Sequence, residues 1–288
     1  MDNINFPALF QSADEASNKA QQRYLLLIRS EYLVLFVAAA LSMPWSTEPI
    51  YYAAYALIFV ISIVLLLVRK LMKLEQGWYR TRALAESIKT SSWRYMMKTP
   101  PFDGQQADAR REFVDLLRDL LSSNREAGRA LASTVTTGEQ VTDVMESHRS
   151  QALAARKATY ISGRIDDQCG WYARKAIFNR NASITWITLC IGVYIAAGGI
   201  VLSRIAFPDW TIWPISPLIV CASSIIGWMQ IKKFGELSSA YALTAQEIGL
   251  IKAKVGEEMD ESEFSEFVNE AELAFSREHT QWIARQHM

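Results

Sequence analysis

The chain has few of the residues from which disulfide frameworks, metal sites and nucleic-acid interfaces are made. Its 288 residues include three cysteines, and Cys169, Cys190 and Cys221 lie too far apart to form a C-x-x-C pair. This spacing argues against a disulfide framework or a zinc site and predicts reduced thiols. The formal net charge is zero, so no basic excess favours nucleic acid as a partner. We expect neither a metal nor a cofactor.

Local signatures of catalysis are also missing. The sequence has no glycine-rich phosphate loop, no H-E-x-x-H pattern and no G-x-S-x-G pattern. Its three histidines, His148, His279 and His287, stand on polar stretches without a carboxylate or cysteine at ligand spacing, and we expect them to be solvated. A site assembled from distant segments leaves no local pattern, but the sequence itself predicts a protein that is not an enzyme.

Apolar residues are abundant and are separated from the charged ones. Hydrophobic residues make up 50% of the chain, although 21% of its residues are charged. A bilayer core about 30 Å thick requires about 20 helical residues, and soluble helices normally keep a polar face. Leu57–Val68, by contrast, contains no polar residue other than Ser62. The sequence therefore predicts four membrane-crossing helices within four uncharged runs: Tyr32–Ser46, Ile50–Val68, Ile184–Ser203 and Trp210–Ile231.

Two short turns join these runs in pairs. Met43–Pro49 links the first two runs and Arg204–Asp209 links the last two, so each pair is predicted to be an antiparallel hairpin. Lysine and arginine flank the open ends of both hairpins, whereas the turns carry only Arg204. Because positive residues mark the cytosolic side of a membrane protein, we expect both termini and the middle segment in the cytosol. The polar segment Met1–Gln22 is not expected to be a cleaved signal peptide.

Two charged residues stand at the membrane boundary of the first run. Arg29 and Glu31 lie just before Tyr32. Charged side chains near a helix end usually reach back to the interface, and the alternative places these two in a protein-lined cavity or a pore mouth. No Asp, Glu, Lys, Arg or His lies well inside any of the four runs. Ion-coupled transport is therefore disfavoured, whereas a pore is not.

Small and hydroxylated residues occur within the last two runs. Gly192-x-x-x-Ala196 and Ser223-x-x-x-Gly227 are small-x-x-x-small pairs that let helix backbones approach closely. Such pairs fit packing within a hairpin or contacts between copies around a pore. Hydroxyl groups can line a pore or bond back to their own helix. The candidate pore or packing residues are Gly192, Ala196, Ser223, Gly227, Thr188 and Ser216.

The segments outside the membrane runs show helical patterns and no strand pattern. One helix is predicted over residues 70–97. A capping-box pattern at Thr137–Gln140 predicts a long polar helix that runs to Asn181 and continues into the third run. A last helix is expected to begin near Asp260, with Glu263 three residues on. The predicted fold class is therefore all-α, with four transmembrane helices in two hairpins and long cytosolic helices.

A basic series precedes the third run. Its members are Arg149, Arg156, Lys157, Arg164, Arg174 and Lys175. One interpretation is a solvated flank that sets the orientation of the hairpin. The other is an anion site for phospholipid headgroups or a nucleotide, with Arg164, Arg174 and Lys175 as its contacts.

The two halves of the chain repeat one plan. Ala85 and Ile88 follow the first hairpin as Ala245 and Ile248 follow the second, an offset of roughly 150–160 residues that indicates duplication. Both copies enter the membrane from the same side, so the repeat is parallel. The predicted division is residues 1–150, with a hairpin at about 31–68 and cytosolic helices at about 70–150, and residues 151–288, with a hairpin at about 184–231 and C-terminal helices at about 233–287.

Motif residues flank both hairpins. Around the second hairpin they are Trp171, Tyr172, Tyr241, Glu247, His279 and Trp282. After the first hairpin they include Ala85-Glu86, Trp93-Arg94-Tyr95 and Pro101-Phe102. In this order and membrane placement the chain resembles the SLATT family, the SMODS and SLOG-associating two-transmembrane effectors, as two tandem copies of different subtypes.

The resemblance implies a bacterial membrane effector of a conflict or antiphage defence system, placed in the inner membrane with both termini cytosolic. It implies a protein that oligomerises and forms a pore or disrupts the membrane on a signal, halting the infected cell. The partners it implies are the lipid bilayer, further copies of the chain and a cytosolic nucleotide-signalling or sensor protein. It supplies no catalytic residues. The alternatives are a non-conducting membrane scaffold or regulatory anchor, and a constitutive small-solute channel.

Overall fold

The computed structural model describes residues 4–124, 131, 134, 136–256 and 259–286, with side chains described as far as Ser276. All regular secondary structure in these residues is helical, which confirms the predicted fold class. The chain divides into two compact units, and each unit takes segments from both tandem halves. The head unit comprises Met1–Gln22, Leu74–Tyr172 and Leu243–Met288, and the membrane unit comprises Arg23–Lys73 and Ala173–Ala242.

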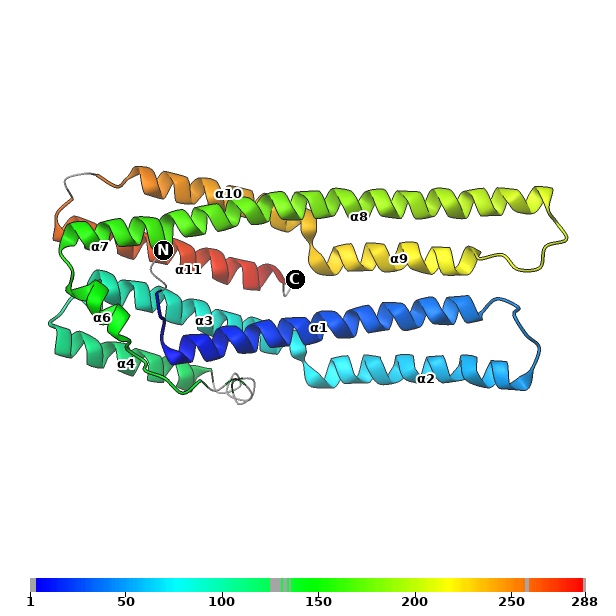
Figure 1. Ribbon diagram of the computed structural model, residues 1–288, viewed down its shortest axis with the longest axis horizontal. Helices are drawn as coiled ribbons and strands as arrows, with labels where there is room; N and C mark the ends of the chain where they lie inside the picture. The colour runs from blue at the N-terminus through cyan, green and yellow to red at the C-terminus, as the bar shows by residue number, and fades with distance from the viewer. Residues whose placement is uncertain (1–3, 125–130, 132–133, 135, 257–258, 287–288) are drawn as a thin grey trace. The chain divides into compact units, whose positions relative to one another are not determined.

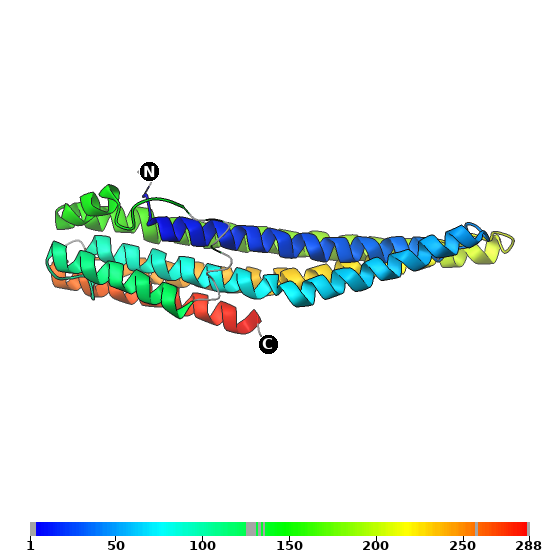
Figure 2. The same cartoon turned by 90° about the horizontal axis from the view of Figure 1, so that it is seen from below.

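The membrane unit contains two antiparallel helical hairpins. Its helices are α1 (Ala8–Leu41), α2 (Pro49–Met72), α8 (Asp167–Ala206) and α9 (Ile215–Lys232), of which α1 and α8 begin in the head unit. The described residues contain four helical stretches that are long and apolar enough to cross a membrane, as predicted. Figures 1 and 2 both show the turns of the two hairpins at the same end of the membrane unit, as a parallel repeat requires.

The second turn differs from the prediction. Helix α8 continues to Ala206, and α9 begins only at Ile215, so residues 207–214 connect them. Pro214 occupies the N-cap position of α9, and a proline restricts the residue before it to extended backbone. The fourth membrane helix therefore has 18 residues and excludes Trp210, with which the apolar run begins.

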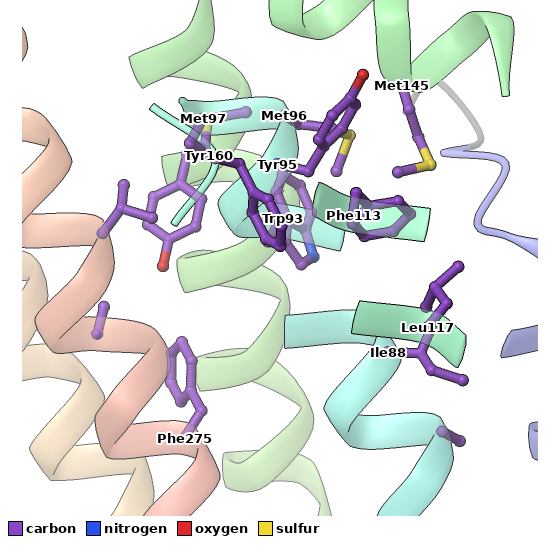
Figure 3. Packing of buried hydrophobic residues seen from close by; sticks show 14 of the residues in the cluster. Ile88, Trp93, Tyr95, Met96, Met97, Phe113, Leu117, Met145, Tyr160 and Phe275 are labelled. Atoms are coloured by element: carbon purple, nitrogen blue, oxygen red, sulfur yellow. The ribbon is translucent and has the colours of Figure 1, made fainter. Parts of the chain in front are cut away.

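The head unit is a bundle of helices around α3. It contains α3 (Leu74–Met97), α4 (Gln106–Ser123), α6 (Asp143–Ser150), α7 (Leu153–Tyr160), the π-helix η1 (Ile161–Asp166), the last part of α10 (Phe234–Ala253), and α11 (Glu261–Gln286). Helix α3 packs against α4, α6, α7 and α11. Figure 3 shows the buried side chains at the centre: Ile88, Trp93, Tyr95, Met96, Met97, Phe113, Leu117, Met145, Tyr160 and Phe275.

The two halves contribute equivalent residues to this core. Ala85 and Ile88 of the first half are buried, and so are Ala245 and Ile248 of the second. In each half the alanine precedes the isoleucine by three residues, which places both side chains on one face of a helix. Both copies of the pattern are therefore buried, and Ala85, Ile88 and Ile248 belong to the core of the head unit.

The capping box of the last helix is confirmed. The backbone amide of Glu263 donates to Asp260 Oδ1 at 2.9 Å, and the amide of Asp260 donates to Glu263 Oε2 at 3.0 Å. Two otherwise unsatisfied amides at the start of α11 are thereby bonded.

The long polar helix predicted from Thr137 is wrong at its beginning. Helix α6 starts at Asp143, where Thr142 Oγ1 accepts from the amide of Met145 at 3.3 Å. Gln151 and Ala152 then adopt extended backbone and interrupt the helix. A continuous helical stretch runs from Leu153 to Ala206 and carries the third membrane run, as expected.

The residues of the predicted box cap a different helix. Gln140 Oε1 accepts from the backbone amide of Leu9 at 3.1 Å, and the carbonyl of Glu139 accepts from Ala8 at 3.1 Å. Both donors belong to the first turn of α1, whose amides have no partner within the helix. The predicted capping box is therefore wrong, and two of its residues instead bond the start of a helix that is far away in sequence.

Candidate functional site

Three arginines of the basic series are buried in the head unit. Arg149, Arg156 and Arg164 expose 2%, 1% and 1% of their surface, so the expectation of a solvated flank is wrong for these three. Buried arginines persist only where their donors are paired, because an uncompensated charge is costly in a protein interior. The partners of these side chains therefore identify the polar interior of the head unit.

The first two arginines hold the end of α3. Arg149 donates to the carbonyl of Tyr95 at 2.6 Å, and its guanidinium lies over the Tyr95 ring at 4.8 Å. Arg156 donates to the carbonyl of Met97 at 2.8 Å and also bonds the carboxylate of Glu261. The last carbonyls of a helix lack partners and favour a nearby cation. These bonds fasten α6, α7 and α11 to the C-terminus of α3.

The third arginine forms a fully buried ion pair with α11. Arg164 Nε lies 2.9 Å from Glu272 Oε1, and Arg164 Nη2 lies 2.7 Å from Glu272 Oε2. The hydroxyl of Tyr160 also donates to Glu272 Oε1, at 3.0 Å. The ring of Phe275 covers the guanidinium at 4.8 Å. The carboxylate thus accepts three hydrogen bonds and exposes none of its side chain.

The environment of this pair shifts the pKa of neighbouring groups. Burial, and then the charge of Glu272, raises the pKa of Tyr160 well above its ordinary value, so the tyrosine stays protonated and donates. Burial tends to lower the pKa of Arg164, but the charge and hydrogen bonds of Glu272 outweigh it and the net shift is upward. Lys89 has a lowered pKa, first because of burial and second because of the nearby Arg164 charge. Arg164 therefore keeps its charge, and Tyr160 keeps its proton.

The pair is attached to the π-helix that precedes α8. Arg164 lies within η1, between α7 and α8. The space beside Gly163 is filled by Trp93, since a Cβ atom there would lie 3.1 Å from Trp93 Cη2. π-Helical turns are rare and occur frequently at functional sites. The Arg164–Glu272 pair and Trp93 therefore contact the π-helical turn that leads into α8.

Most candidate pore or packing residues face outward from the single chain. Those that are exposed are Thr188, Gly192, Ala196, Ser216 and Ser223. Cys190, Ala222 and Ile225 fill the contact between α8 and α9 instead. Gly227 is different, because Tyr32 of α1 packs directly against it. The two hairpins thus meet within one chain at Gly227, while the other small residues remain uncovered.

The boundary charges have separate partners within the membrane unit. Glu31 Oε2 lies 3.0 Å from Arg69 Nη1 of α2, and its other carboxylate oxygen is buried without a partner among the described residues. The Arg29 side chain is exposed and lies over the ring of Trp228, 5.0 Å from its centroid. Arg29 lies at the surface, whereas Glu31 belongs to an intrahairpin ion pair.

The remaining sequence candidates are dispersed. Arg174, Lys175 and Glu247 are exposed, and Trp171, Tyr172 and Tyr241 are half-buried, with Trp171 edge-on to Tyr172 at 4.9 Å. His148 is buried, so the expectation that it is solvated is wrong. The side chains of His279, Trp282 and His287 lie outside the described part of the chain. Over the described residues, no three His, Cys, Asp or Glu side chains form a group that could hold a metal ion.

The partner of Arg164 was not identified from the sequence, although a signal was present. Glu272 stands four residues after Val268 and three before Phe275, and these spacings place it on the apolar stripe of α11. A carboxylate on such a stripe indicates a buried cationic partner. The sequence alone does not say which of the basic residues that partner is.

Comparison with protein families accounts for nearly the whole chain. Residues 7–157 match the SMODS and SLOG-associating 2TM effector domain 3, and residues 160–282 match the SMODS and SLOG-associating 2TM effector domain 1. No curated protein and no solved structure matches the chain. SLATT effector domains are associated with conflict and defence systems, and neither match indicates an enzyme family. The predicted pair of tandem copies of different subtypes is confirmed, and the chain belongs to the SLATT family as a multi-pass membrane protein with two tandem effector domains.

Proposed function

We propose that this protein is an effector of a bacterial conflict system that oligomerises in the inner membrane and forms a pore or disrupts the bilayer. A cytosolic sensor or nucleotide-signalling protein supplies the signal. One observation carries the oligomeric part of this proposal: apolar or weakly polar groups fill the contact between α8 and α9, whereas five candidate pore or packing residues face outward, namely Thr188, Gly192, Ala196, Ser216 and Ser223. A path for ions would therefore have to be lined by several copies.

The contacts inside the membrane unit support this reasoning. Cys190, Ala222 and Ile225 close the space between α8 and α9 with apolar or weakly polar groups. Thr188 and Ser223 are exposed to the surroundings of the single chain. Hydroxyl groups in a membrane gain from bonding to other helices or to water in a pore. Association of several copies through the face that carries Thr188, Gly192 and Ala196 would give these hydroxyl groups other helices or pore water to bond.

The head unit is suited to restrain the membrane helices until a signal arrives. Removing one member of a buried ion pair costs about 3–5 kcal/mol, and about 5.5 kcal/mol takes a two-state population from 1:99 to 99:1. If α11 leaves Arg164, η1 loses a contact that holds it in the π form. A π turn holds one residue more than an α-helical turn. Its conversion to α-helix would therefore shift the register of α8 by one residue, which corresponds to a rotation of about 100° about the helix axis. A signal that displaces α11 would thus act on a membrane helix.

The orientation follows from charge. Lysines and arginines concentrate at the open ends of the hairpins, so these ends and the head unit are proposed to face the cytosol. A cytosolic head is also the arrangement in which a cytosolic partner reaches α11.

Disulfide cross-linking tests the oligomer. In a variant with Cys169, Cys190 and Cys221 replaced by alanine, Ala196→Cys is expected to form cross-linked dimers in native membranes on oxidation. Leu67→Cys, on the exposed face of α2, is the matched control and is expected to cross-link less. Equal cross-linking at both positions, or none at Ala196, contradicts the proposed face.

Membrane permeability tests the effector activity. Expression of the chain with the proteins encoded beside it is expected to collapse the membrane potential of a bacterial host and to admit an excluded dye. If the membrane potential and the exclusion of dye are unchanged during a triggered response, the result would favour a non-conducting membrane scaffold. Permeability without any trigger would favour a constitutive channel.

A further inference from the structure

The segment Thr136–Thr142, called the strap below, bonds the first turn of α1. The backbone carbonyl of Glu139 accepts a hydrogen bond from the amide of Ala8 at 3.1 Å. Gln140 Oε1 accepts one from the amide of Leu9, also at 3.1 Å. These are the first two amides of α1, and the first amides of a helix have no acceptor within it. The strap therefore supplies acceptors that α1 itself lacks.

The strap is also bonded at both of its ends. The amide of Thr136 donates to Ser12 Oγ at 3.0 Å. Thr142 Oγ1 donates to the carbonyl of Asn5 at 2.7 Å. Ser12 and Thr142 each expose only 6% of their surface, and a buried polar group that loses its partner costs free energy. These two bonds, together with those of Glu139 and Gln140, fasten the strap to the start of α1.

Most of the strap lies at the surface of the head unit. Residues 137–140 are exposed, whereas Val141 is buried and belongs to the core. Segments with few buried apolar side chains and exposed hydrogen bonds open locally while the rest of a fold stays intact. The strap can therefore leave α1 without unfolding the helix bundle.

Helix α1 connects this contact to the membrane hairpins. It is continuous from Ala8 to Leu41 and passes from the head unit into the membrane unit. Helix α8 also passes between the units, and the π-helix before it is bonded through Arg164 to Glu272. The four bonds of the strap are made by other residues. The contact on α1 and the contact before α8 can therefore be broken separately.

We propose that the strap restrains the first hairpin and must leave the start of α1 before the membrane helices open. This inference rests on the proposed function, because it presupposes that the hairpins open on a signal. It adds a second restraint, since the Arg164–Glu272 pair acts on α8 whereas the strap acts on α1. The strap opens spontaneously from time to time, and its opening is followed by movement of the hairpins once the ion pair is lost. A covalent link between the strap and α1 prevents this step.

A reversible disulfide can supply that link. A Cβ atom at Gly138 would lie 3.4 Å from the Cβ atom of Ala8, and disulfides join Cβ atoms that are about 3.5–4.5 Å apart. Ala8→Cys with Gly138→Cys is therefore expected to form a cross-link on oxidation. The full-length chain for this experiment has alanine in place of Cys169, Cys190 and Cys221, so that no other disulfide can form.

Potassium release from liposomes measures the effect of the cross-link. The cysteine pair is placed in a Glu272→Gln background, in which the ion pair is already lost. We expect the reduced protein to release potassium, the oxidised protein to retain it, and reduction to restore the release. Ala8→Cys alone in the same background is the control and should release potassium in both redox conditions. Equal release by the oxidised and the reduced cysteine pair would overturn the proposed restraint.

Hydrogen exchange at the amides of Ala8 and Leu9 reports the opening of the strap whether or not the hairpins conduct. Ser12→Ala removes the acceptor of the Thr136 amide. It should raise the exchange rate of both amides by about two- to tenfold, although Ser12 bonds neither of them, because the strap opens as a unit.

Ser92→Ala is the matched control for this substitution. Ser92 and Ser12 are both buried, and each hydroxyl donates to the carbonyl four residues earlier in its own helix. The control should leave the exchange of Ala8 and Leu9 unchanged. No rise in Ser12→Ala, or an equal rise in Ser92→Ala, would overturn the strap as an opening unit. If no variant releases potassium while Ser12→Ala alone raises the exchange, the proposed pore fails and the opening of the strap stands.

Discussion

Arg164 Nη2 lies 2.7 Å from Glu272 Oε2, and the two side chains expose 2% and 0% of their surface. The residues are far apart in sequence and connect the π-helix before α8 to the last helix of the chain. A buried pair of this kind is not in itself strong evidence for stability, because desolvation opposes the attraction. The pair instead specifies how η1 and α11 pack, because neither side chain can stay buried and charged without the other.

Breaking this pair on one side should be far more costly than removing both partners. Arg164→Met leaves the Glu272 carboxylate buried with only Tyr160 as a donor, and we expect a loss of about 3–5 kcal/mol in the free energy of unfolding. Arg164→Met with Glu272→Met should recover most of this loss. Denaturation of the full chain in detergent measures both.

The control for that comparison is an exposed pair. Arg118→Met breaks the 2.6 Å contact with Asp115 on the surface of α4 and should change stability by less than about 0.5 kcal/mol. If the single and double variants of the buried pair lose the same stability, the two side chains are not coupled.

The Tyr160 hydroxyl should contribute through one hydrogen bond to a charged acceptor. Tyr160→Phe keeps the buried ring and removes the 3.0 Å bond to Glu272. We expect destabilisation by about 1.5–3 kcal/mol, less than for Arg164→Met, measured in the same denaturation assay. In the Arg164→Met, Glu272→Met background the substitution should cost much less, and an undiminished cost there would contradict the proposed bond.

Gly163 should tolerate little added volume. Because Trp93 is buried and a Cβ atom at Gly163 would lie 3.1 Å from its ring, Gly163→Val should destabilise the head unit by about 1–3 kcal/mol. Gly77 has open space around it, and Gly77→Val serves as the control. The melting temperatures of the two variants are compared with that of the parent. Equal decreases in the two variants would argue against a tight contact at η1.

Lys89 should make stability depend on pH in the alkaline range. Burial and the charge of Arg164 lower its pKa in the folded chain, so between the folded and unfolded pKa values the unfolded chain binds more protons. Stability should therefore rise with pH through this window and be lowest, with respect to this group, where Lys89 is charged in both states.

Replacement of this lysine isolates its contribution. Lys89→Gln should be more stable than the parent at neutral pH, and its alkaline rise should be flatter. Melting temperatures measured from pH 7 to pH 10 give the comparison. A parallel profile for parent and variant would show that another group is responsible.

The membrane hairpins and the start of the last helix were predictable because their signals are local. Uncharged runs define the membrane hairpins, and the capping pair Asp260 and Glu263 defines the start of α11. The burial of Arg164 was not predictable, because its partner lies on a distant helix and the same basic residues fit a solvated flank equally well. Gln140 illustrates the same limit, since the local pattern wrongly predicted a helix from Thr137, whereas the Gln140 side chain bonds the start of α1, which is remote in sequence.

Ion flux through liposomes that contain the full chain tests the central claim most directly. The parent, held by the Arg164–Glu272 pair, should retain potassium; Glu272→Gln, which leaves Arg164 without its counter-charge, should release it. Arg164→Met with Glu272→Met, in which apolar packing replaces the ion pair, should retain it again. Retention by a folded, membrane-inserted Glu272→Gln variant, or equal leakage from all three proteins, would contradict a membrane effector restrained by its head unit.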